Sequence, residues 1–569
     1  MKKKREWQIY FLLFVLFFIF GVVVCRLFFI QVLKHSVYAA LAENQNQISQ
    51  KLIPKRGEIF VQDKNFSLTP LATLREYPSV YLVPREITQE KEKISDELSK
   101  ILEMEKNEIL EKINKIGDPY EPLKSKLSDE TAEQIKNLNF KGVYLADEDL
   151  RWYPQKNLAS HLLGFVGYKD GQKLGQYGLE GFWEENLAGQ SGLLNTEKDA
   201  LGQWLLIGDY NLKPAQDGDN LFLTIDPNIQ FIAEKELKAL LEKWNSSGGS
   251  IVISDPKTGA IKAMASFPNY DPNEYNKVQN VNEFLNPVIQ KVYEPGSIFK
   301  PFTMAAGLDT GKIIPDTTYV DTGSVQIKGS VISNALNRSY GLSNMSKVLE
   351  KSINTGAVFI ERTVGNEDFR KYVEAFGFNR PTGIDLAGEI GGNINNLKGN
   401  KEIDFATASF GQGIAVTPLE LVAAIGAIAN EGKMMKPYVV EKIVHSDGRE
   451  QNFEPEPVRQ VISEQTANKL TAMLVNTVRS GYDKVKIKGY FIAGKTGTAQ
   501  VPLEDKAGYS SDETIHSFAG YAPAYNPKFL IFIKMDKPRG IAFASDSLSP
   551  VFANIARYLF NYYEIPPDE

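Results

Sequence analysis

An uncharged apolar run near the N-terminus constrains this chain more than any other feature. The run extends from Ile9 to Val24, and apolar character resumes at Leu27 after Arg26. With its flanks it is about 20 residues long, which is enough for a helix to span the hydrocarbon core of a bilayer. A basic cluster, Lys2-Lys3-Lys4-Arg5, precedes it, and such clusters favour the cytoplasmic side. The sequence therefore predicts a cytoplasmic tail over residues 1–8 and a transmembrane anchor over residues 9–30.

Two other interpretations of this run are a cleaved signal peptide and a lipoprotein signal. A signal peptide should end in a small-x-small cleavage site, and Val24-Cys25-Arg26-Leu27 does not provide one. The bulky Val24 before Cys25 also argues against a lipoprotein cysteine. We therefore expect an uncleaved single-pass anchor in the inner (cytoplasmic) membrane, with the rest of the chain on the periplasmic side. No cysteine follows Gln31, so the exported part should depend on packed cores and not on disulfides.

Length and charge limit the classes of protein that remain. A chain of 569 residues is too long for one ordinary core and suggests about three or four domains. Its hydrophobic fraction of 43% and charged fraction of 24% are typical of globular domains. The net charge of -6 is too small to predict nucleic acid as a partner.

Residues 31–217 are predicted to form a non-catalytic pedestal. Its first polar segment, residues 38–55, has helical potential. Residues 86–145 carry apolar side chains at helical spacing between lysines and glutamates, which predicts a helical subdomain. The best interpretation of this subdomain is helices that pack on the pedestal and perform no chemistry.

The last part of the predicted pedestal is rich in glycine and aromatic residues. These occur in Arg151-Trp152-Tyr153-Pro154, around His161, and from Gly175 to Glu180. Glycines at this density indicate tight turns and close backbone approach, so we expect structural roles for these residues and for His161. Residues 186–219 read as irregular, and we place the domain boundary at residues 217/218.

The C-terminal region, residues 218–569, is predicted to have an α+β fold. Leu221–Ile225 reads as a strand, Pro227–Leu241 as an amphipathic helix, and the segment around Asp255 as a hairpin. Lys528–Met535 reads as another strand, and a terminal helix begins at Ser549-Pro550. Strands at both ends of a domain with helices between them fit an antiparallel sheet covered by helices.

Ser297 and Lys300 form the first pattern that suggests chemistry. Pro295-Gly296 ends a loop and the apolar segment after Lys300 predicts a helix, so Ser297 lies at a helix start. There, unpaired backbone amides and the helix dipole would stabilise a developing oxyanion. The i, i+3 spacing places the Lys300 amine on the same face, where a lowered pKa would let it accept the serine's proton. Alone, the pattern is more often an N-cap serine beside a solvated lysine.

Two further patterns follow along the chain. Ser352 and Asn354 form a Ser-x-Asn pair, and Lys495-Thr496-Gly497-Thr498 lies in a β-prone stretch, where Gly497 would let an extended substrate approach. The chain also contains decoys of two patterns, Ser254-Asp255-Pro256-Lys257 and Lys257-Thr258-Gly259. We reject the first because a hairpin turn does not hold Ser254 and Lys257 on one face. We reject the second because Lys257 lies in the turn and precedes the serine in the chain, whereas Lys495 begins a strand.

In this order, Ser-x-x-Lys, Ser-x-Asn and Lys-Thr-Gly are the signature of penicillin-recognising serine acyltransferases. The chain resembles the class B penicillin-binding proteins, which are monofunctional peptidoglycan D,D-transpeptidases, and in particular their division-associated FtsI type. The resemblance runs nearly from end to end: the anchor, Arg56-Gly57, residues 151–154, residues 175–180, the three motifs and Thr407–Gly413. Two positions depart from the family pattern. The residue after the serine, often threonine, is Ile298, and the usual aspartate after Arg-Gly is displaced to Asp63.

The resemblance implies a mechanism. Lys300 deprotonates Ser297, which attacks the penultimate D-Ala of a stem peptide and expels the terminal D-Ala. Ser352 relays a proton to the leaving amine, while Asn354 and Lys495 orient Ser352 and Lys300. The remaining implied roles belong to the substrate: backbone amides of Ser297 and Thr498 hold the oxyanion, and Thr496 and Thr498 bind the terminal carboxylate.

The resemblance also implies partners and leaves rivals open. The expected ligands are stem peptides and β-lactams, which would bind covalently. The expected protein partners are a multispanning glycan polymerase and other division membrane proteins. No cofactor is expected. Four scattered histidines offer no metal-ligand spacing and disfavour a Ser-His-Asp triad, although His516 could be a neighbour of the site. The rivals are a serine β-lactamase, a catalytically silent β-lactam-binding scaffold or sensor, and an elongation-type transpeptidase.

Overall fold

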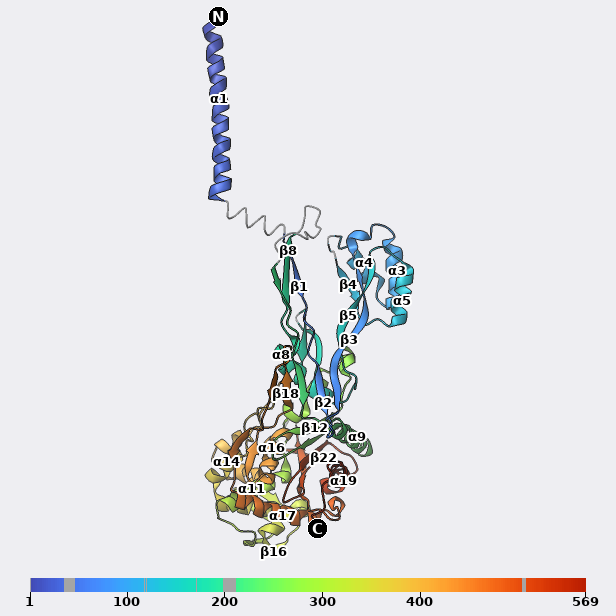
Figure 1. Ribbon diagram of the computed structural model, residues 1–569. Coiled ribbons are helices and arrows are strands. Elements are labelled where there is room, and N and C mark those ends of the chain that lie inside the picture. Colours follow the sequence, from blue (N-terminus) through green and yellow to red (C-terminus); the bar gives the residue numbers. More distant parts are fainter. Residues whose placement is uncertain are drawn as a thin grey trace. The chain divides into compact units, whose positions relative to one another are not determined.

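The computed structural model describes residues 2–34, 47–116, 118, 120–169, 171–197, 211–503 and 508–568. The chain forms two compact units (Figure 1). One consists of residues 1–55 with 189–217, and the other of residues 56–188 with 218–569. His35 and residues 38–46 of the predicted helical segment lie outside the described residues.

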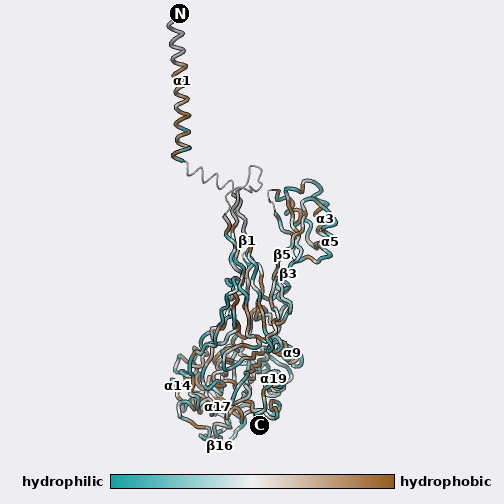
Figure 2. The backbone as a smooth tube through the Cα atoms, viewed as in Figure 1, coloured by the Kyte–Doolittle hydropathy of each residue, from teal (hydrophilic) through white to brown (hydrophobic). Residues whose placement is uncertain are grey.

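The first unit contains the apolar N-terminal helix. Helix α1 (Lys2–Phe28) continues into a π-helical turn (Phe29–Leu33). Its apolar side chains from Phe11 to Phe28 are exposed, and Figure 2 shows the hydrophobic character of most of its length. The stretch Phe11–Phe28 is long and apolar enough to cross a membrane, which is consistent with the predicted single-pass anchor.

A small antiparallel sheet completes the first unit. Its strands are β1 (Gln47–Leu52), β8 (Gly192–Glu197) and β9 (Asn211–Lys213), in the order β1-β8-β9. Two predictions are wrong here, because residues 47–52 form a strand and not a helix, and the segment 186–219 contains strands. Strand β1 pairs with a segment that begins at Gly192, so local sequence carries no sign of the pairing.

The helical subdomain lies in the second unit. Helices α3 (Lys91–Leu102), α4 (Lys106–Ile113) and α5 (Asp129–Leu138) pack against β3 (Leu68–Leu82) and β5 (Val143–Trp152). Most of the apolar side chains at helical spacing are buried, and Ile101 and Leu110 are half-buried. The buried ones are Ile94, Leu98, Leu102, Ile109 and Ile113. The sequence analysis did not predict strand β4 (Glu121–Lys124). This strand lies between α4 and α5 in the sequence and pairs with β3.

One sheet joins the two sequence regions of the second unit. Strand β2 (Ile59–Gln62) pairs antiparallel with β3 and parallel with β10 (Asn220–Leu223). On its other side β10 pairs antiparallel with β18 (Val440–Val444), and β18 pairs antiparallel with β19 (Glu450–Asn452). Residues before and after the first unit's β8–β9 segment therefore share backbone hydrogen bonds.

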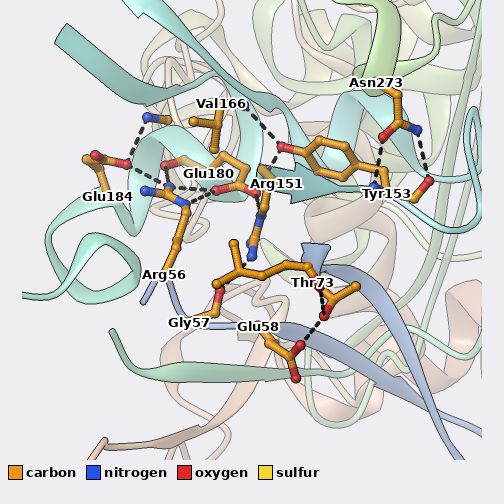
Figure 3. A network of polar contacts seen from close by, with 12 residues as sticks. Arg56, Gly57, Glu58, Thr73, Arg151, Tyr153, Val166, Glu180, Glu184 and Asn273 are labelled. Carbon is orange, nitrogen blue, oxygen red and sulfur yellow. Dashed lines mark hydrogen bonds and ion pairs between the residues drawn. The ribbon is translucent and has the colours of Figure 1, made fainter. Parts of the chain in front are cut away.

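A buried ionic cluster lies beside this sheet (Figure 3). Glu180 is fully buried, and its carboxylate pairs with Arg56 and with Arg151, each at 2.6 Å. The hydroxyl of Tyr153 donates to Glu180 at 3.0 Å, and Arg151 donates to the carbonyl of Gly57 at 2.7 Å. These contacts agree with the structural role expected for the Arg-Gly, Arg-Trp-Tyr-Pro and glycine-rich segments.

Close backbone approach explains one glycine of this region. A Cβ at Gly175 would lie 2.0 Å from the carbonyl oxygen of Glu180, so only glycine fits. His161 is a packed residue. Its Nε2 lies 2.9 Å from the carbonyl oxygen of Glu283, and burial lowers its pKa to about 4. The short elements around these residues are α6 (Ser160–Leu163), β6 (Phe165–Lys169), β7 (Gln172–Gln176), α7 (Gly178–Phe182) and α8 (Glu184–Ala188).

The C-terminal region contains the predicted antiparallel sheet. Its strands, in spatial order, are β12 (Ile261–Phe267), β11 (Gly248–Ser254), β23 (Phe529–Asp536), β22 (Tyr509–Ala522) and β21 (Ala493–Pro502). Side chains alternate between its faces. Ile251 and Ile253 pack with helices α9 (Pro227–Lys243) and α19 (Ser549–Tyr562), whereas Val252 faces the core that contains α11 (Lys300–Asp309), α16 (Pro418–Ala429) and α17 (Glu464–Gly481).

Smaller elements complete this region. They are α10 (Pro287–Gln290), β13 (Thr318–Asp321), β14 (Ser324–Ile327), β15 (Ser330–Ser333), β16 (Gly341–Asn344), α12 (Met345–Glu350), α13 (Asn354–Val364), α14 (Asn366–Ala375), α15 (Glu402–Ala408), β17 (Lys433–Met435), β20 (Pro457–Gln460) and α18 (Ala544–Ser547). Helices therefore cover both faces of an antiparallel sheet, as the sequence predicts for an α+β fold.

Candidate active site

Ser297 lies in the first turn of a helix, as its sequence context predicts. A 3-10 turn, Gly296–Phe299, leads directly into α11, which begins at Lys300. The backbone amide of Gly296 donates to the carbonyl of Gly411 at 2.9 Å, which ties this turn to the predicted Thr407–Gly413 motif. Ser297 is half-buried and lines a cleft of about 940 Å³.

Lys300 is buried beneath this cleft, with only 1% of its surface exposed. Its amine contacts the carbonyl of Ser352 at 2.5 Å, the Ser352 hydroxyl at 3.1 Å and Oδ1 of Asn354 at 2.8 Å. Burial, reinforced by the positive charge of Lys495, lowers the pKa of Lys300 well below its usual value. In the described part of the chain no carboxylate forms an ion pair with Lys300, so its neutral form is favoured.

Ser352 and Asn354 approach Lys300 from the junction of α12 and α13. Ser352 has a φ of 55°, a left-handed conformation that non-glycine residues seldom adopt. Its hydroxyl lies 3.1 Å from the amines of both Lys300 and Lys495. Ser352 therefore bridges the two lysines.

Strand β21 brings the Lys-Thr-Gly-Thr motif to the same place. Lys495 contacts Ser352, and Thr496 and Thr498 line the cleft. Gly497 points the other way, since successive side chains of a strand alternate. A Cβ there would lie 2.6 Å from Ser517 Oγ and 2.8 Å from the carbonyl oxygen of Pro295. The small size of Gly497 therefore lets β21 pack against the turn that carries Ser297, and its part in admitting an extended substrate stays a prediction.

Tyr482, which the sequence analysis did not single out, also belongs to this site. It follows α17 and lines the cleft. Its hydroxyl accepts from the Lys495 amine at 3.3 Å and from the Thr496 hydroxyl at 2.9 Å. Tyr482 lies 13 residues before Lys495 in no recognisable pattern, so nothing local marks it.

Other candidate residues are excluded by their positions. His516 lies opposite Thr498 in the sheet but is fully buried, its Nδ1 is 2.8 Å from Ser547 Oγ, and burial lowers its pKa to about 4. It is a packed histidine. In the decoy, Ser254 is buried at the end of β11, whereas Lys257 lies in the turn and donates to Asn526. Among the described residues, no group of histidines, cysteines and carboxylates could hold a metal ion.

The two departures from the family pattern have ordinary structural explanations. Ile298 is fully buried in the core around α11. Asp63 accepts hydrogen bonds from the backbone amides of Asn65 and Ser67 and so closes the turn between β2 and β3. Neither residue reaches the cleft.

Comparison with known proteins assigns both regions to families. Residues 249–557 match the penicillin binding protein transpeptidase domain, and residues 51–223 match the penicillin-binding protein dimerisation domain. The chain is 34% identical over 556 residues to stage V sporulation protein D of Bacillus subtilis, a match that covers 96% of this chain and 84% of that protein. It is 29% identical over 573 residues to the peptidoglycan D,D-transpeptidase FtsI of Buchnera aphidicola, covering 99% and 96% of the two chains.

A solved structure gives the same result. Penicillin binding protein 3 of Mycobacterium tuberculosis, complexed with aztreonam, aligns with a TM-score of 0.70 and 26% identity, covering 91% of this chain and 98% of that one.

Proposed function

The chain belongs to the class B penicillin-binding proteins and is a peptidoglycan D,D-transpeptidase, and from this premise we propose that Ser297 is its nucleophile and Lys300 the base that activates it. The observation that carries the proposal is the pair of buried lysine amines joined by the Ser352 hydroxyl, with the Lys300 pKa lowered by burial and by Lys495. A neutral amine one helical turn from a half-buried serine is suited to take the serine's proton.

The remaining groups complete a cycle of acyl transfer. Ser297 attacks the carbonyl of the penultimate D-Ala and forms an ester, and the proton removed from Ser297 passes through Lys300 and Ser352 to the leaving amine of the terminal D-Ala. The amine of a neighbouring stem peptide then attacks the ester and restores the serine. Asn354 and Lys495 hold Ser352 and Lys300 through the contacts described above.

Substrate binding is assigned to the strand beside the serine. The backbone amides of Ser297 and Thr498 hold the oxyanion, a type of donor whose loss costs about 10²- to 10³-fold in rate. The hydroxyls of Thr496 and Thr498 receive the terminal carboxylate. Gly497 supports this arrangement from behind, by allowing β21 to pack on the Pro295–Ile298 turn.

The test is intact-mass spectrometry of residues 31–569 after addition of benzylpenicillin, followed over hours. We expect a long-lived adduct on the wild type and none on Ser297→Ala, as for a β-lactam target. Rapid loss of the adduct would indicate a β-lactamase, and an adduct on Ser297→Ala would remove Ser297 from its role. A wild type that forms no adduct would point to a silent scaffold.

We propose septal cell-wall synthesis during division as the cellular role. In this proposal residues 1–8 lie in the cytoplasm and residues 218–569 on the periplasmic side. Residues 31–217 form the pedestal that positions the catalytic domain. The likeness to an FtsI supports a division role, while the likeness to a sporulation protein supports sporulation as a second candidate. A fluorescent fusion that gathers at the septum of growing cells would support the first; one that appears only in sporulating cells would support the second. Uniform location along the cell wall would favour an elongation enzyme.

The partner we propose is a separate glycan polymerase. The two matched families are a transpeptidase domain and a dimerisation domain, and neither of them polymerises glycan strands. We expect a multispanning membrane protein to co-purify with the full chain in mild detergent. Its absence, when other division proteins are retained, would contradict this partner.

A further inference from the structure

Residues 318–344 form an arm that makes one wall of the active-site cleft. Strands β13 and β16 form its base, and the β14–β15 hairpin extends from them. Between the hairpin and β16 the chain passes through a turn, residues 334–340. Leu336, Arg338 and Tyr340 of this turn line the same cleft as Ser297.

The arm is fastened to the catalytic residues by a buried aspartate. Asp321 is 1% exposed, and it accepts hydrogen bonds from the hydroxyl of Thr355 at 2.6 Å, from Asn334 Nδ2 at 2.9 Å and from the backbone amide of Tyr340 at 2.7 Å. Thr355 directly follows Asn354, whose own side-chain amide donates to the carbonyl of Ser333. The arm and the Ser-x-Asn motif are therefore parts of one hydrogen-bonded structure.

The same network fixes the turn that carries Arg338. Asn334 Nδ2 also donates to the carbonyl of Arg338 at 3.0 Å. Between them, Leu336 and Asn337 have φ values of 56° and 53°. Left-handed backbone at non-glycine residues costs free energy and persists only where surrounding contacts impose it, often at ligand-binding positions.

Arg338 is a cation without a counter-ion at the mouth of the cleft. Its side chain is exposed, and the structure gives it no ion pair within the described part of the chain. The other charged side chains that line the cleft, Lys351 and Glu350, pair with each other at 2.7 Å. An incoming anion would thus meet one unpaired guanidinium on this wall.

We propose that Arg338 recognises a carboxylate of the stem peptide other than the C-terminal one, and that Asp321 is the positioning residue that holds it there. The inference rests on the proposed function, which assigns the C-terminal carboxylate to Thr496 and Thr498. A guanidinium presents two parallel N–H donors to a carboxylate, which gives geometric selectivity as well as attraction. Because Arg338 is exposed, its contribution is modest and acts on peptide choice, not on the chemistry at Ser297.

The test uses synthetic pentapeptide donors that end in D-Ala-D-Ala. The two peptides of the first pair differ only at the second residue, which carries a free carboxylate in one peptide and a carboxamide in the other. The second pair differs in the same way at the third residue. We expect wild-type kcat/KM to favour the carboxylate form of at least one pair by about five- to tenfold, as for a charge-assisted hydrogen bond at a solvated site. Arg338→Gln should abolish this preference, mainly through KM, and Arg338→Lys should retain part of it.

Lys328 provides the matched control. It is exposed at the tip of the β14–β15 hairpin, on the same arm but outside the cleft lining. Lys328→Gln removes the same charge and should leave the preference intact; loss of the preference here as well would reduce it to a long-range charge effect and overturn the proposal. Asp321→Asn should weaken the preference, and if that variant does not fold, the Arg338 variants still decide.

The inference and the proposed function fail differently. Wild-type protein that forms the benzylpenicillin adduct and turns over the donors, but shows no carboxylate preference or keeps it in Arg338→Gln, overturns the inference alone. Wild-type protein that neither forms the adduct nor turns over any donor overturns the proposed function, and the inference with it.

Discussion

Two buried clusters of charged residues in the second unit are built on opposite principles. Around Glu180, the carboxylate lies between Arg56 and Arg151, and every member has an ionic partner. Around Ser352, two lysines of the same sign share a hydroxyl, and in the described residues neither has a carboxylate partner. We call these the ionic cluster and the lysine pair.

The pKa shifts follow from this difference. In the ionic cluster burial opposes charge, but the two arginines outweigh it and lower the pKa of Glu180, while Glu180 and Glu184 raise that of Arg56. In the lysine pair burial and the neighbouring charge act in the same direction and lower the pKa of Lys300. Buried opposite charges keep each other ionised and hold structure together, whereas a buried like-charged pair produces a neutral base.

Replacing Lys300 should separate activity from stability. We expect Lys300→Met to slow acylation by benzylpenicillin by about 10²- to 10⁴-fold, the usual contribution of a general base. Any fall in the thermal midpoint should be small, because the loss of the amine's hydrogen bonds to Ser352 and Asn354 is offset by removal of a buried polar group that has no counter-ion among the described residues. Adduct formation by mass spectrometry and circular dichroism melting measure the two effects.

The decoy lysine is the control for this experiment. Lys257→Met, in the other Ser-x-x-Lys pattern, should leave acylation unchanged, since Lys257 lies in the turn after β11. Unchanged acylation by Lys300→Met would break the comparison.

Replacing Glu180 should give the opposite result. Glu180→Ala leaves Arg56 and Arg151 buried without their shared partner, and breaking a buried ion pair in this way costs about 3–5 kcal/mol. We expect a large fall in the urea midpoint and an unchanged acylation rate for the molecules that remain folded. Glu184→Ala, which removes a partly exposed carboxylate that pairs with Arg56 but not with Arg151, should cost much less. Equal losses for the two variants would contradict the central place of Glu180.

Glu361 tests what happens to a buried carboxyl group that has no hydrogen-bond partner among the described residues. Both of its carboxylate oxygens lack a hydrogen-bond partner among the described residues, and burial raises its pKa to about 7. Above pH 7 the folded state must hold an unpaired carboxylate; as pH falls below 7 it takes up a proton before the unfolded chain does, and is stabilised. Glu361→Gln should therefore raise stability by about 1–3 kcal/mol at pH 8 and by progressively less towards pH 5. A stability gain in Glu361→Gln that is the same at pH 5 and pH 8 would contradict the raised pKa of Glu361 in the folded state.

Tyr482 gives the smallest effect. Tyr482→Phe removes the acceptor of the Lys495 and Thr496 hydrogen bonds. Because Thr496 lines the cleft and Lys495 contacts Ser352, we expect a loss of about three- to fivefold in kcat/KM, near 1 kcal/mol. If Tyr482 acts mainly by positioning Thr496, the rise in KM should be larger than the fall in kcat. Steady-state kinetics with a D-Ala-D-Ala donor measures both, and loss in kcat alone would shift the role to Lys495.

The sequence predicts those parts of the site that lie in short patterns. Ser297 and Lys300 are one helical turn apart, and Ser352 with Asn354, like Lys495 with Thr498, form runs whose order along the chain is informative. Three strands of the main sheet are predictable for a similar reason, since β11 and β12 form a hairpin and β23 is a buried apolar strand.

The remaining features depend on partners that are distant in sequence. Tyr482 acts through residues in another element, and Asp321 meets Thr355 across 34 positions. Strand β1 pairs with β8, and a side chain at position 497 would collide with the carbonyl oxygen of Pro295. In each case the physical reason for the residue is a contact that no local pattern contains.

The most direct test of the lysine pair is the pH dependence of acylation by benzylpenicillin, measured as a second-order rate constant. If Lys300 is the base, the rate rises as pH passes through its lowered pKa and levels off below 10.5, the ordinary value for lysine. Lys495→Met should move the midpoint to higher pH, because it removes the positive charge beside Lys300. A midpoint at the ordinary lysine value that does not move in Lys495→Met would contradict the account.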